Sequence, residues 1–399
     1  MKKIKFILII FLLFIIYVYT VYITQIPKNV ILMSNEEFKI RKLFGVEIIE
    51  TINTSNNNLN TVNIEVNLFG KLKLKETLIT TIENIKVVPV GKVIGLKMYT
   101  NGVLIVGMSE IEDKNNVMLK PYENAGIEEG DTILKINENY IEDINDLKNI
   151  VNLSNGKNLE MTLVRNGTLI NTSITPVETE NNEYMLGLWV KDAATGVGTM
   201  SFYEPETKSF AVLGHGIIDS DTEKLIDIDS GELVTAKIIS LKKGIPEKPG
   251  EIKGTIVSQP TVGNIKINTQ FGVFGRLDNL TALNIDLSQA IDVANRNEIK
   301  EGDATLLCAS NVNNLVKEYK IEIEKIYIDN DYNNKSMLIR VNDENLLEET
   351  GGIIRGLSGA PIIQNGKFIG AVTNVLVSNP EIGYAVFADL MIKELNRID

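Results

Sequence analysis

The stretch that decides the fold is GGIIRGLSGAP, residues 351–361, in which Ser358 lies directly before Gly359. Glycines at this spacing allow a tight turn, and such a turn can expose the serine hydroxyl beside the amide N–H groups of Gly356 and Ser358. Two donors of this kind are what the oxyanion of an acyl-transfer intermediate requires. The stretch therefore predicts a serine nucleophile with an oxyanion hole, and a glycine-rich turn with an incidental serine is the alternative.

The residues after this turn predict a β-hairpin. Residues 362–363 and 368–372 are apolar and flank Asn365-Gly366, which gives the order strand, tight turn, strand. A serine on a loop that leads into a hairpin is typical of chymotrypsin-like proteases, whereas other hydrolases carry it on a strand-to-helix elbow.

The chain has one histidine, His215, in the sequence LGHG at 213–216. A lone histidine is more often structural than catalytic, but a serine nucleophile needs a nearby base, and imidazole suits this role at neutral pH. One histidine and one cysteine, Cys308, exclude multi-histidine zinc sites, cysteine clusters and an internal disulfide. We therefore expect no metal and no cofactor.

The N-terminus predicts a membrane anchor. Lys2, Lys3 and Lys5 precede an apolar run over residues 6–23, which is long enough to span a bilayer and would leave the bulk of the chain outside the cytoplasm. A cleaved signal peptide is the alternative, although no small-x-small cleavage site follows the run. The net charge of −12 argues against nucleic acid as a partner.

Two further modules follow the anchor. Apolar and polar residues alternate over 62–75, which predicts an antiparallel strand pair in a small β region after a polar, Asn-rich linker at 51–60. Next, AGIEEGDTILKIN at 125–137 and a helix capped by Asp143 closely resemble a PDZ domain. That resemblance implies a groove that accepts extended peptide C-termini by strand addition, with its carboxylate-binding loop at Val93, Ile94, Gly95 and Leu96.

The order of anchor, PDZ-like module, GHG and TGGIIRGLSGAPIIQNGKFIGAVT at 350–373 resembles one family as a whole. These are the stage IV sporulation protein B peptidases, membrane-associated serine proteases of endospore-forming bacteria. The resemblance implies Ser358 as nucleophile, His215 as general base, Asp343 as the acidic member and the amides of Gly356 and Ser358 as oxyanion hole. Because a carboxylate that orients the histidine usually lies farther from the serine, three other aspartates stay open for that role: Asp278, Asp286 and Asp292.

The expected fold is mainly β, with a membrane anchor or signal at 1–27, a small β region at 28–90, a PDZ domain at 91–178 and a chymotrypsin-like double β-barrel at 183–399. Short strands with turn signals dominate the last part, whose best helix patterns are Leu287–Ala294 and Leu390–Leu395.

The resemblance also implies a role in the space between the forespore and mother-cell membranes. There the enzyme would cleave itself and a membrane-bound regulatory protein under PDZ control, and so trigger processing of a pro-sigma factor. A non-catalytic PDZ adaptor on a degenerate protease-like barrel is the alternative function.

Overall fold

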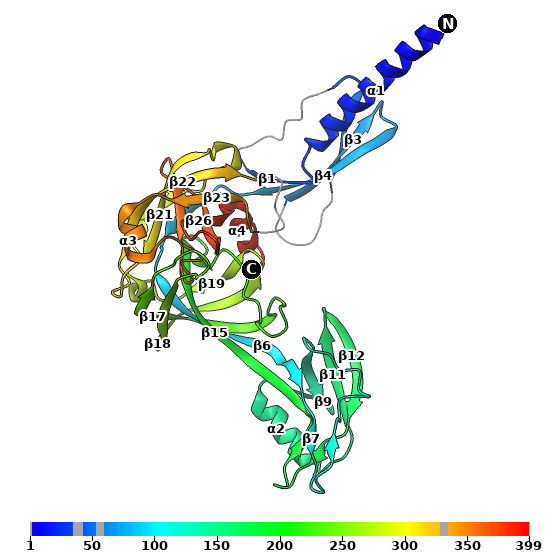
Figure 1. Ribbon diagram of the computed structural model, residues 1–399, viewed down its shortest axis with the longest axis vertical. Helices are drawn as coiled ribbons and strands as arrows, with labels where there is room; N and C mark the ends of the chain where they lie inside the picture. Colours follow the sequence, from blue (N-terminus) through cyan, green and yellow to red (C-terminus); the bar gives the residue numbers. More distant parts are fainter. Residues whose placement is uncertain (1, 35–42, 53–59, 328–333, 399) are drawn as a thin grey trace.

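The computed structural model describes residues 2–34, 43–52, 60–327 and 334–398, and it shows a mainly β protein with a projecting N-terminal helix (Figure 1). Most of the polar segment expected to be a linker, residues 53–59, lies outside the described residues. The mainly β fold class expected from the sequence is confirmed.

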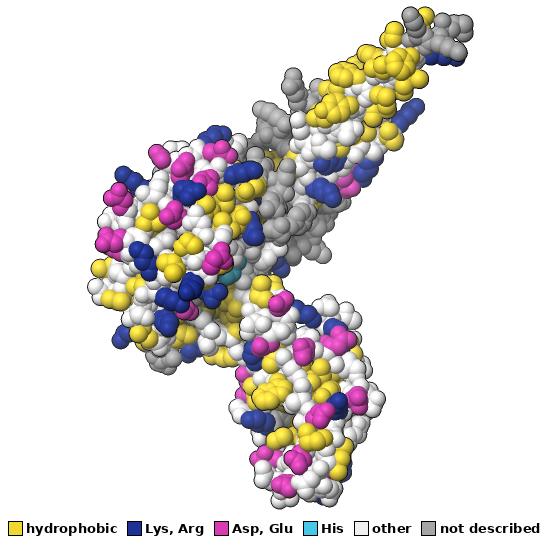
Figure 2. Space-filling model, viewed as in Figure 1, with side chains coloured by type: hydrophobic (Ala, Val, Ile, Leu, Met, Phe, Trp, Pro, Cys, Tyr) yellow, Lys and Arg dark blue, Asp and Glu magenta, His cyan; other side chains and the backbone are white. Residues whose placement is uncertain are grey.

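The projecting helix is α1 (Lys2–Thr24), and its stretch Ile4–Thr24, 21 residues, is long and apolar enough to cross a membrane. Hydrophobic side chains lie along much of this helix on the face shown in Figure 2. A four-stranded sheet adjoins it, in the order β1 (Asn29–Met33), β4 (Leu72–Ile82), β3 (Asn60–Leu68), β2 (Val46–Ile52). The expected antiparallel pair is therefore found as β3 and β4.

Two six-stranded barrels form the body of the molecule. The first is a ring of antiparallel pairs that runs β6 (Val93–Met108), β17 (Ile228–Lys242), β18 (Glu251–Thr269), β19 (Gly272–Leu277), β16 (Ser209–Val212), β15 (Leu188–Glu204) and back to β6. The second closes through β21 (Gly302–Ala309), β22 (Val316–Ile326), β23 (Met337–Val341), β26 (Ile382–Phe387), β25 (Lys367–Val375) and β24 (Pro361–Gln364).

The second barrel carries the predicted hairpin. Asn365 and Gly366 have φ values of 52° and 73° and connect β24 to β25, as expected for an Asn-Gly turn. Two helices adjoin this barrel, α3 (Glu344–Thr350) and α4 (Ala388–Leu395), and the second confirms the predicted C-terminal helix.

The barrels are joined by hydrogen bonds from the Asn314 side chain to the backbone of β6 and by a shared core. Asn314, on the loop between β21 and β22, accepts a hydrogen bond from Val93 N (2.9 Å) and donates one to Val93 O (2.7 Å). The rings of Phe202 and Phe368 meet edge to face at 5.2 Å. These contacts fix the relative position of the two barrels.

Beyond the first barrel, β6 and β15 run side by side into a smaller unit (Figure 1). This unit, here called the α2 unit, packs around a core that spans Val103 to Leu186. It contains β9 (Thr132–Ile136), β11 (Leu159–Arg165), β12 (Thr168–Ile174) and α2 (Ile144–Leu153). Asp143 caps α2 by accepting from Asn145 N and Asp146 N, as predicted, while the assignment as a PDZ domain stays a prediction.

The structure corrects the predicted carboxylate-binding loop. Val93, Ile94, Gly95 and Leu96 form the first half of β6, where β15 pairs on one side and, from Ile94 onward, β17 pairs on the other. The side chains of Val93, Ile94 and Leu96 are at most 1% exposed. Because this segment is a buried barrel strand, its amides are not free to capture a peptide terminus.

The expected helix at Leu287–Ala294 is also wrong, because that stretch forms η2 (Leu287–Gln289) and β20 (Ile291–Asp292). The other short elements are β5 (Lys86–Pro89), β7 (Ile111–Glu112), β8 (Met118–Leu119), β10 (Asn139–Tyr140), β13 (Val177–Glu178), β14 (Tyr184–Met185), η1 (Thr281–Leu283) and η3 (Arg296–Glu298).

Candidate active site

The serine loop, residues 353–360, connects α3 to β24 and is held by its backbone. Gly356 and Gly359 have φ values of 100° and 96°, which L-residues with a side chain rarely adopt. Gly359 N donates to Val372 O (2.7 Å), and Thr199 N donates to Ser358 O (3.1 Å). The loop is thus fastened to β25 on one side and to β15 of the other barrel on the other side.

The histidine loop, residues 213–217, follows β16 of the first barrel. Leu213 and Gly214 turn the chain with φ values of 76° and 68°. Asn268 on β18 holds the far end of the loop, because its side chain accepts from Ile217 N (2.9 Å) and donates to Ile217 O (2.9 Å). His215 is therefore presented between two anchored points.

The structure brings the two loops together at Thr199. This residue is fully buried, its backbone donates to Ser358 O, and its carbonyl accepts from Leu213 N (3.1 Å). A Cβ on Gly214 would lie 3.2 Å from Val372 O and 3.3 Å from Thr373 Cγ2, and Ser358 Oγ donates to Thr373 O (2.7 Å). Residues from both barrels and two distant parts of the sequence thus meet at one place.

The side chain of His215 is half-buried, and its Nδ1 lies 2.9 Å from Gly216 O. With the proton on Nδ1, the ring donates to this carbonyl and leaves Nε2 as an acceptor. Burial lowers the pKa of His215 below its ordinary value, and the hydrogen bond to Gly216 opposes this shift only in part. The imidazole is therefore neutral at neutral pH, which is the form that accepts a proton.

No hydrogen bond joins Ser358 to His215 among the bonds of the described residues, since each side chain is bonded to a backbone carbonyl. Within the described residues, the amide N–H groups of Gly356 and Ser358 donate no hydrogen bond to the protein. Both residues are only partly buried, so these two donors remain available for an oxygen of a bound molecule.

Thr199 belongs to this site, but no motif in the sequence singled it out as a functional residue. Its hydroxyl donates to Gly356 O (2.6 Å), in addition to its backbone contact with Ser358. The sequence signal was the GVGTM stretch at 196–200, whose threonine has no chemistry of its own to suggest a role.

We expect Thr199→Val to lower peptidase kcat about tenfold with little change in KM, because the carbonyl of Gly356 loses the donor that fixes it. Thr199→Ser keeps the hydroxyl and should restore most of the activity. Ser201→Ala is the matched control, since Ser201 lies two residues along the same strand, is fully buried, and its hydroxyl has no hydrogen-bond partner among the described residues. Equal losses in the Thr199→Val and Ser201→Ala variants would argue against a positioning role.

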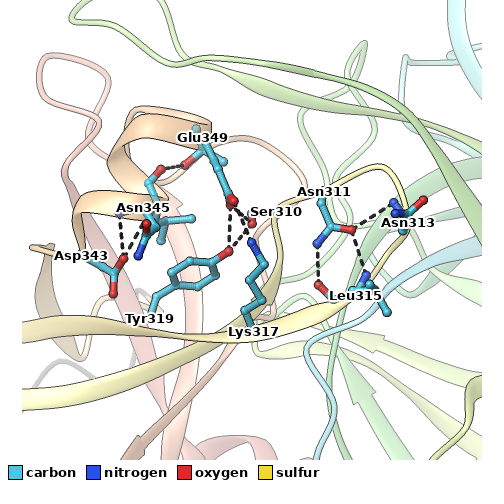
Figure 3. A network of polar contacts seen from close by, with 11 residues as sticks. Ser310, Asn311, Asn313, Leu315, Lys317, Tyr319, Asp343, Asn345 and Glu349 are labelled. Atoms are coloured by element: carbon cyan, nitrogen blue, oxygen red, sulfur yellow. Dashed lines mark hydrogen bonds and ion pairs between the residues drawn. The ribbon is translucent and has the colours of Figure 1, made fainter.

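The structure does not bring Asp343 to His215. Asp343 caps α3 by accepting from Asn345 N (3.0 Å) and Leu346 N (3.3 Å), and it also accepts from Lys320 N (3.1 Å) (Figure 3). Partial burial raises the pKa of Asp343, but these backbone donors outweigh it, so the pKa lies below its usual value. Its carboxylate is thus fully engaged at the start of the helix that leads into the serine loop.

The other end of α3 is anchored as well. Glu349 accepts from Tyr319 OH (2.9 Å) and Ser310 and forms an ion pair with Lys317 (2.8 Å) (Figure 3). Tyr319 and Ser310 are almost fully buried, so this cluster ties α3 to the wall of the second barrel.

We expect Asp343→Asn to keep activity within a few-fold of native, because asparagine caps a helix about as well as aspartate. Asp343→Ala should instead lower stability by about 1 kcal/mol. An acid that holds the histidine would behave differently, since its replacement by asparagine costs about 10⁴-fold in kcat. Steady-state kinetics and thermal unfolding of the two variants separate the roles.

The three other aspartates considered for the acidic role also have partners elsewhere. Asp278 accepts from Asn264 (2.6 Å), Asp286 caps η2 through Ser288, and Asp292 lies 3.9 Å from Lys86 Nζ. Within the described residues, the His215 ring has its hydrogen bond with the carbonyl of Gly216 and with none of these carboxylates.

A double barrel that brings a serine loop and a histidine loop together is the architecture of a peptidase. The chain belongs to the SpoIVB peptidase S55 family, whose model matches residues 182–392, just over half of the chain. No curated protein matches the chain. Among solved structures, the crystal structure of the Rv3671c protease in its inactive form is similar, with 14% identity and a TM-score of 0.27 over 51% of this chain and 84% of that one.

Proposed function

We propose that this protein is a membrane-anchored serine endopeptidase that uses Ser358 as nucleophile and His215 as general base. The observation that carries the proposal is the junction at Thr199, which holds the serine loop and the histidine loop against each other. Membership in a peptidase family supports the same chemistry.

In this mechanism Ser358 turns its hydroxyl from the carbonyl of Thr373 toward His215. The Oγ attacks the peptide carbonyl carbon while Nε2 of His215 takes its proton, and the amides of Gly356 and Ser358 hold the resulting oxyanion. His215 then gives the proton to the leaving amine, and water hydrolyses the acyl-enzyme by the same steps. The carbonyl of Gly216 fixes the tautomer of His215, a task that a carboxylate performs in other serine peptidases.

A fluorophosphonate probe tests this proposal on the full chain in detergent. An adduct on Ser358, identified by mass spectrometry of the digested protein, is the expected result, and His215→Ala should greatly slow its formation. A chain that cleaves a test peptide without acquiring the adduct would exclude Ser358 as nucleophile.

We further propose the role that this family suggests, in which the enzyme cleaves itself and a membrane-bound regulatory protein outside the cytoplasm. The apolar helix α1 supports attachment to a membrane. Incubation of the native chain beside Ser358→Ala tests self-cleavage, because fragments should form only when the serine is present. A non-catalytic adaptor would give the same fragments, or none, in both.

The α2 unit offers a route by which a bound peptide could control the site. A cavity of about 570 Å³ lies between one face of α2 and residues 184–190, so β14 and the start of β15, not Val93–Leu96, line the candidate groove. Farther along β15, Asp192 accepts from Ile144 N at the start of α2 (2.9 Å). Its neighbour Lys191 reaches Asp219 (3.1 Å), four residues after His215.

We expect Lys191→Met to change kcat/KM several-fold. Asp219 is almost fully buried beside the histidine loop, and the substitution removes the cation of its ion pair. Lys114→Met is the control, since Lys114 forms an ion pair with Glu178 in the same unit, away from this junction. If both variants have native kinetics, the α2 unit does not act through Lys191.

A further inference from the structure

The last turns of α1 are part of the folded protein. Tyr19 and Tyr22 pack against the small core formed by Ile26, Val46 and Val66. The ammonium group of Lys75 donates to Ile23 O (3.0 Å) and to Ile26 O, and so satisfies carbonyls at the C-terminal end of the helix. The four-stranded sheet is thus docked directly on the end of the candidate membrane span.

Two phenylalanines at this junction are left in solvent. Phe44 is 84% exposed and Phe69 is 57% exposed, and their rings meet edge to face at 6.1 Å. Phe69 also has a φ of 52°, a left-handed conformation that is rare for a bulky residue. This conformation belongs to the hairpin turn between β3 and β4, and it is supported by a hydrogen bond from Phe69 N to Gly45 O (2.6 Å). The two rings are nevertheless exposed side by side, and an exposed aromatic pair indicates a contact outside the chain.

The position of the pair along α1 points to the kind of contact. The hydroxyl of Tyr19 donates to the carbonyl of Phe44, which places Phe44 beside that residue. Tyr19 lies five residues before the helix end at Thr24, a rise of about 7.5 Å. Tyr17 (65% exposed) and Tyr22 lie on the same stretch, so aromatic side chains from helix and sheet gather at one level, as they do at the boundary between lipid tails and headgroups.

We propose that the Phe44–Phe69 pair inserts into the outer boundary of the lipid bilayer, so that the sheet β1–β4 is a second membrane contact beside α1. The proposal rests on α1 as a membrane anchor. The exposed Lys71, next to the hairpin turn at Phe69-Gly70, would then lie at the level of the lipid phosphates.

The sequence provides a sharp test because it has a single tryptophan, Trp189, which lies in the α2 unit and is 64% exposed. The full chain is reconstituted into phosphatidylcholine vesicles with or without lipids brominated on their acyl chains, which quench tryptophan on contact. The variants are Trp189→Phe combined with Phe69→Trp or with Phe44→Trp. The controls are the native chain and Trp189→Phe combined with Tyr140→Trp, whose position is 63% exposed in the α2 unit.

Brominated lipid should reduce the fluorescence of Phe69→Trp and Phe44→Trp about twofold or more, and leave both controls unchanged. A chain that floats with the vesicles but shows no quenching at positions 44 and 69 overturns the proposal and leaves the anchor intact. A chain that does not float overturns the anchor and the proposal together. Quenching at Trp189 or at position 140 of the same size as at positions 44 and 69 also overturns it, because the contact would not be specific.

Discussion

Ser358→Ala should reduce peptide cleavage by about 10⁴-fold or more, because the variant has no oxygen with which to attack the substrate carbonyl. The fold should remain, since the substitution removes only the hydroxyl and its hydrogen bond to Thr373, a loss of about 1 kcal/mol. The measurement is kcat/KM on an unstructured peptide substrate, with thermal unfolding recorded on the same samples.

The control for this variant is again Ser201→Ala, which deletes a buried hydroxyl from the neighbouring strand and should keep native cleavage. Cleavage by Ser358→Ala at an undiminished rate would falsify the serine mechanism. Loss of cleavage together with loss of the folded state would show instead that Ser358 is a structural residue.

Gly359→Ala should cost at least about 4 kcal/mol of stability and abolish cleavage. An added Cβ would lie 2.0 Å from Thr199 O and 2.6 Å from Leu213 N, and both are backbone atoms that cannot turn aside. The φ of 96° adds strain for any residue with a side chain. Because Gly359 is the point where the serine loop touches both Thr199 and the histidine loop, its replacement forces the two loops apart.

Gly366→Ala is the matched control. Its φ is 73°, but no atom of the described part of the chain lies within 4 Å of an added Cβ, so only the backbone strain of about 1–2 kcal/mol should appear. Circular dichroism during heating, in detergent because of α1, measures both variants. A Gly359→Ala protein as stable as Gly366→Ala would show that the loop can relax, and that the contact at Thr199 is not tight.

Local signals in the sequence predicted several features of the fold correctly. The Asn365-Gly366 turn, the cap at Asp143 and the helix at the C-terminus depend on neighbours a few residues away, so they could be read directly. The many short strands in the sequence predict closed barrels, but the order of the strands within each barrel could not be predicted from them.

The predictions that were wrong concern segments whose structure depends on contacts with distant residues. Whether VIGL at 93–96 is a free loop or a buried strand is decided by β15 and β17, which lie about 100 residues or more further along the chain. The stretch 287–294 has a helical pattern, but pairing of β20 with β5 overrides it. Spacing alone could not distinguish a catalytic Asp343 from a helix cap, because both roles favour aspartate.

Strand β6 has a consequence for how this protein can be divided. Its first half completes the first barrel and its second half lies in the α2 unit, although it precedes the region matched by the family model. A fragment cut at residue 183 would have five strands in place of six and would expose the edges of β15 and β17 to pairing with other molecules. The first barrel and the α2 unit are therefore inseparable by simple truncation, and a gene rearrangement that moved one without the other would yield a chain prone to aggregation.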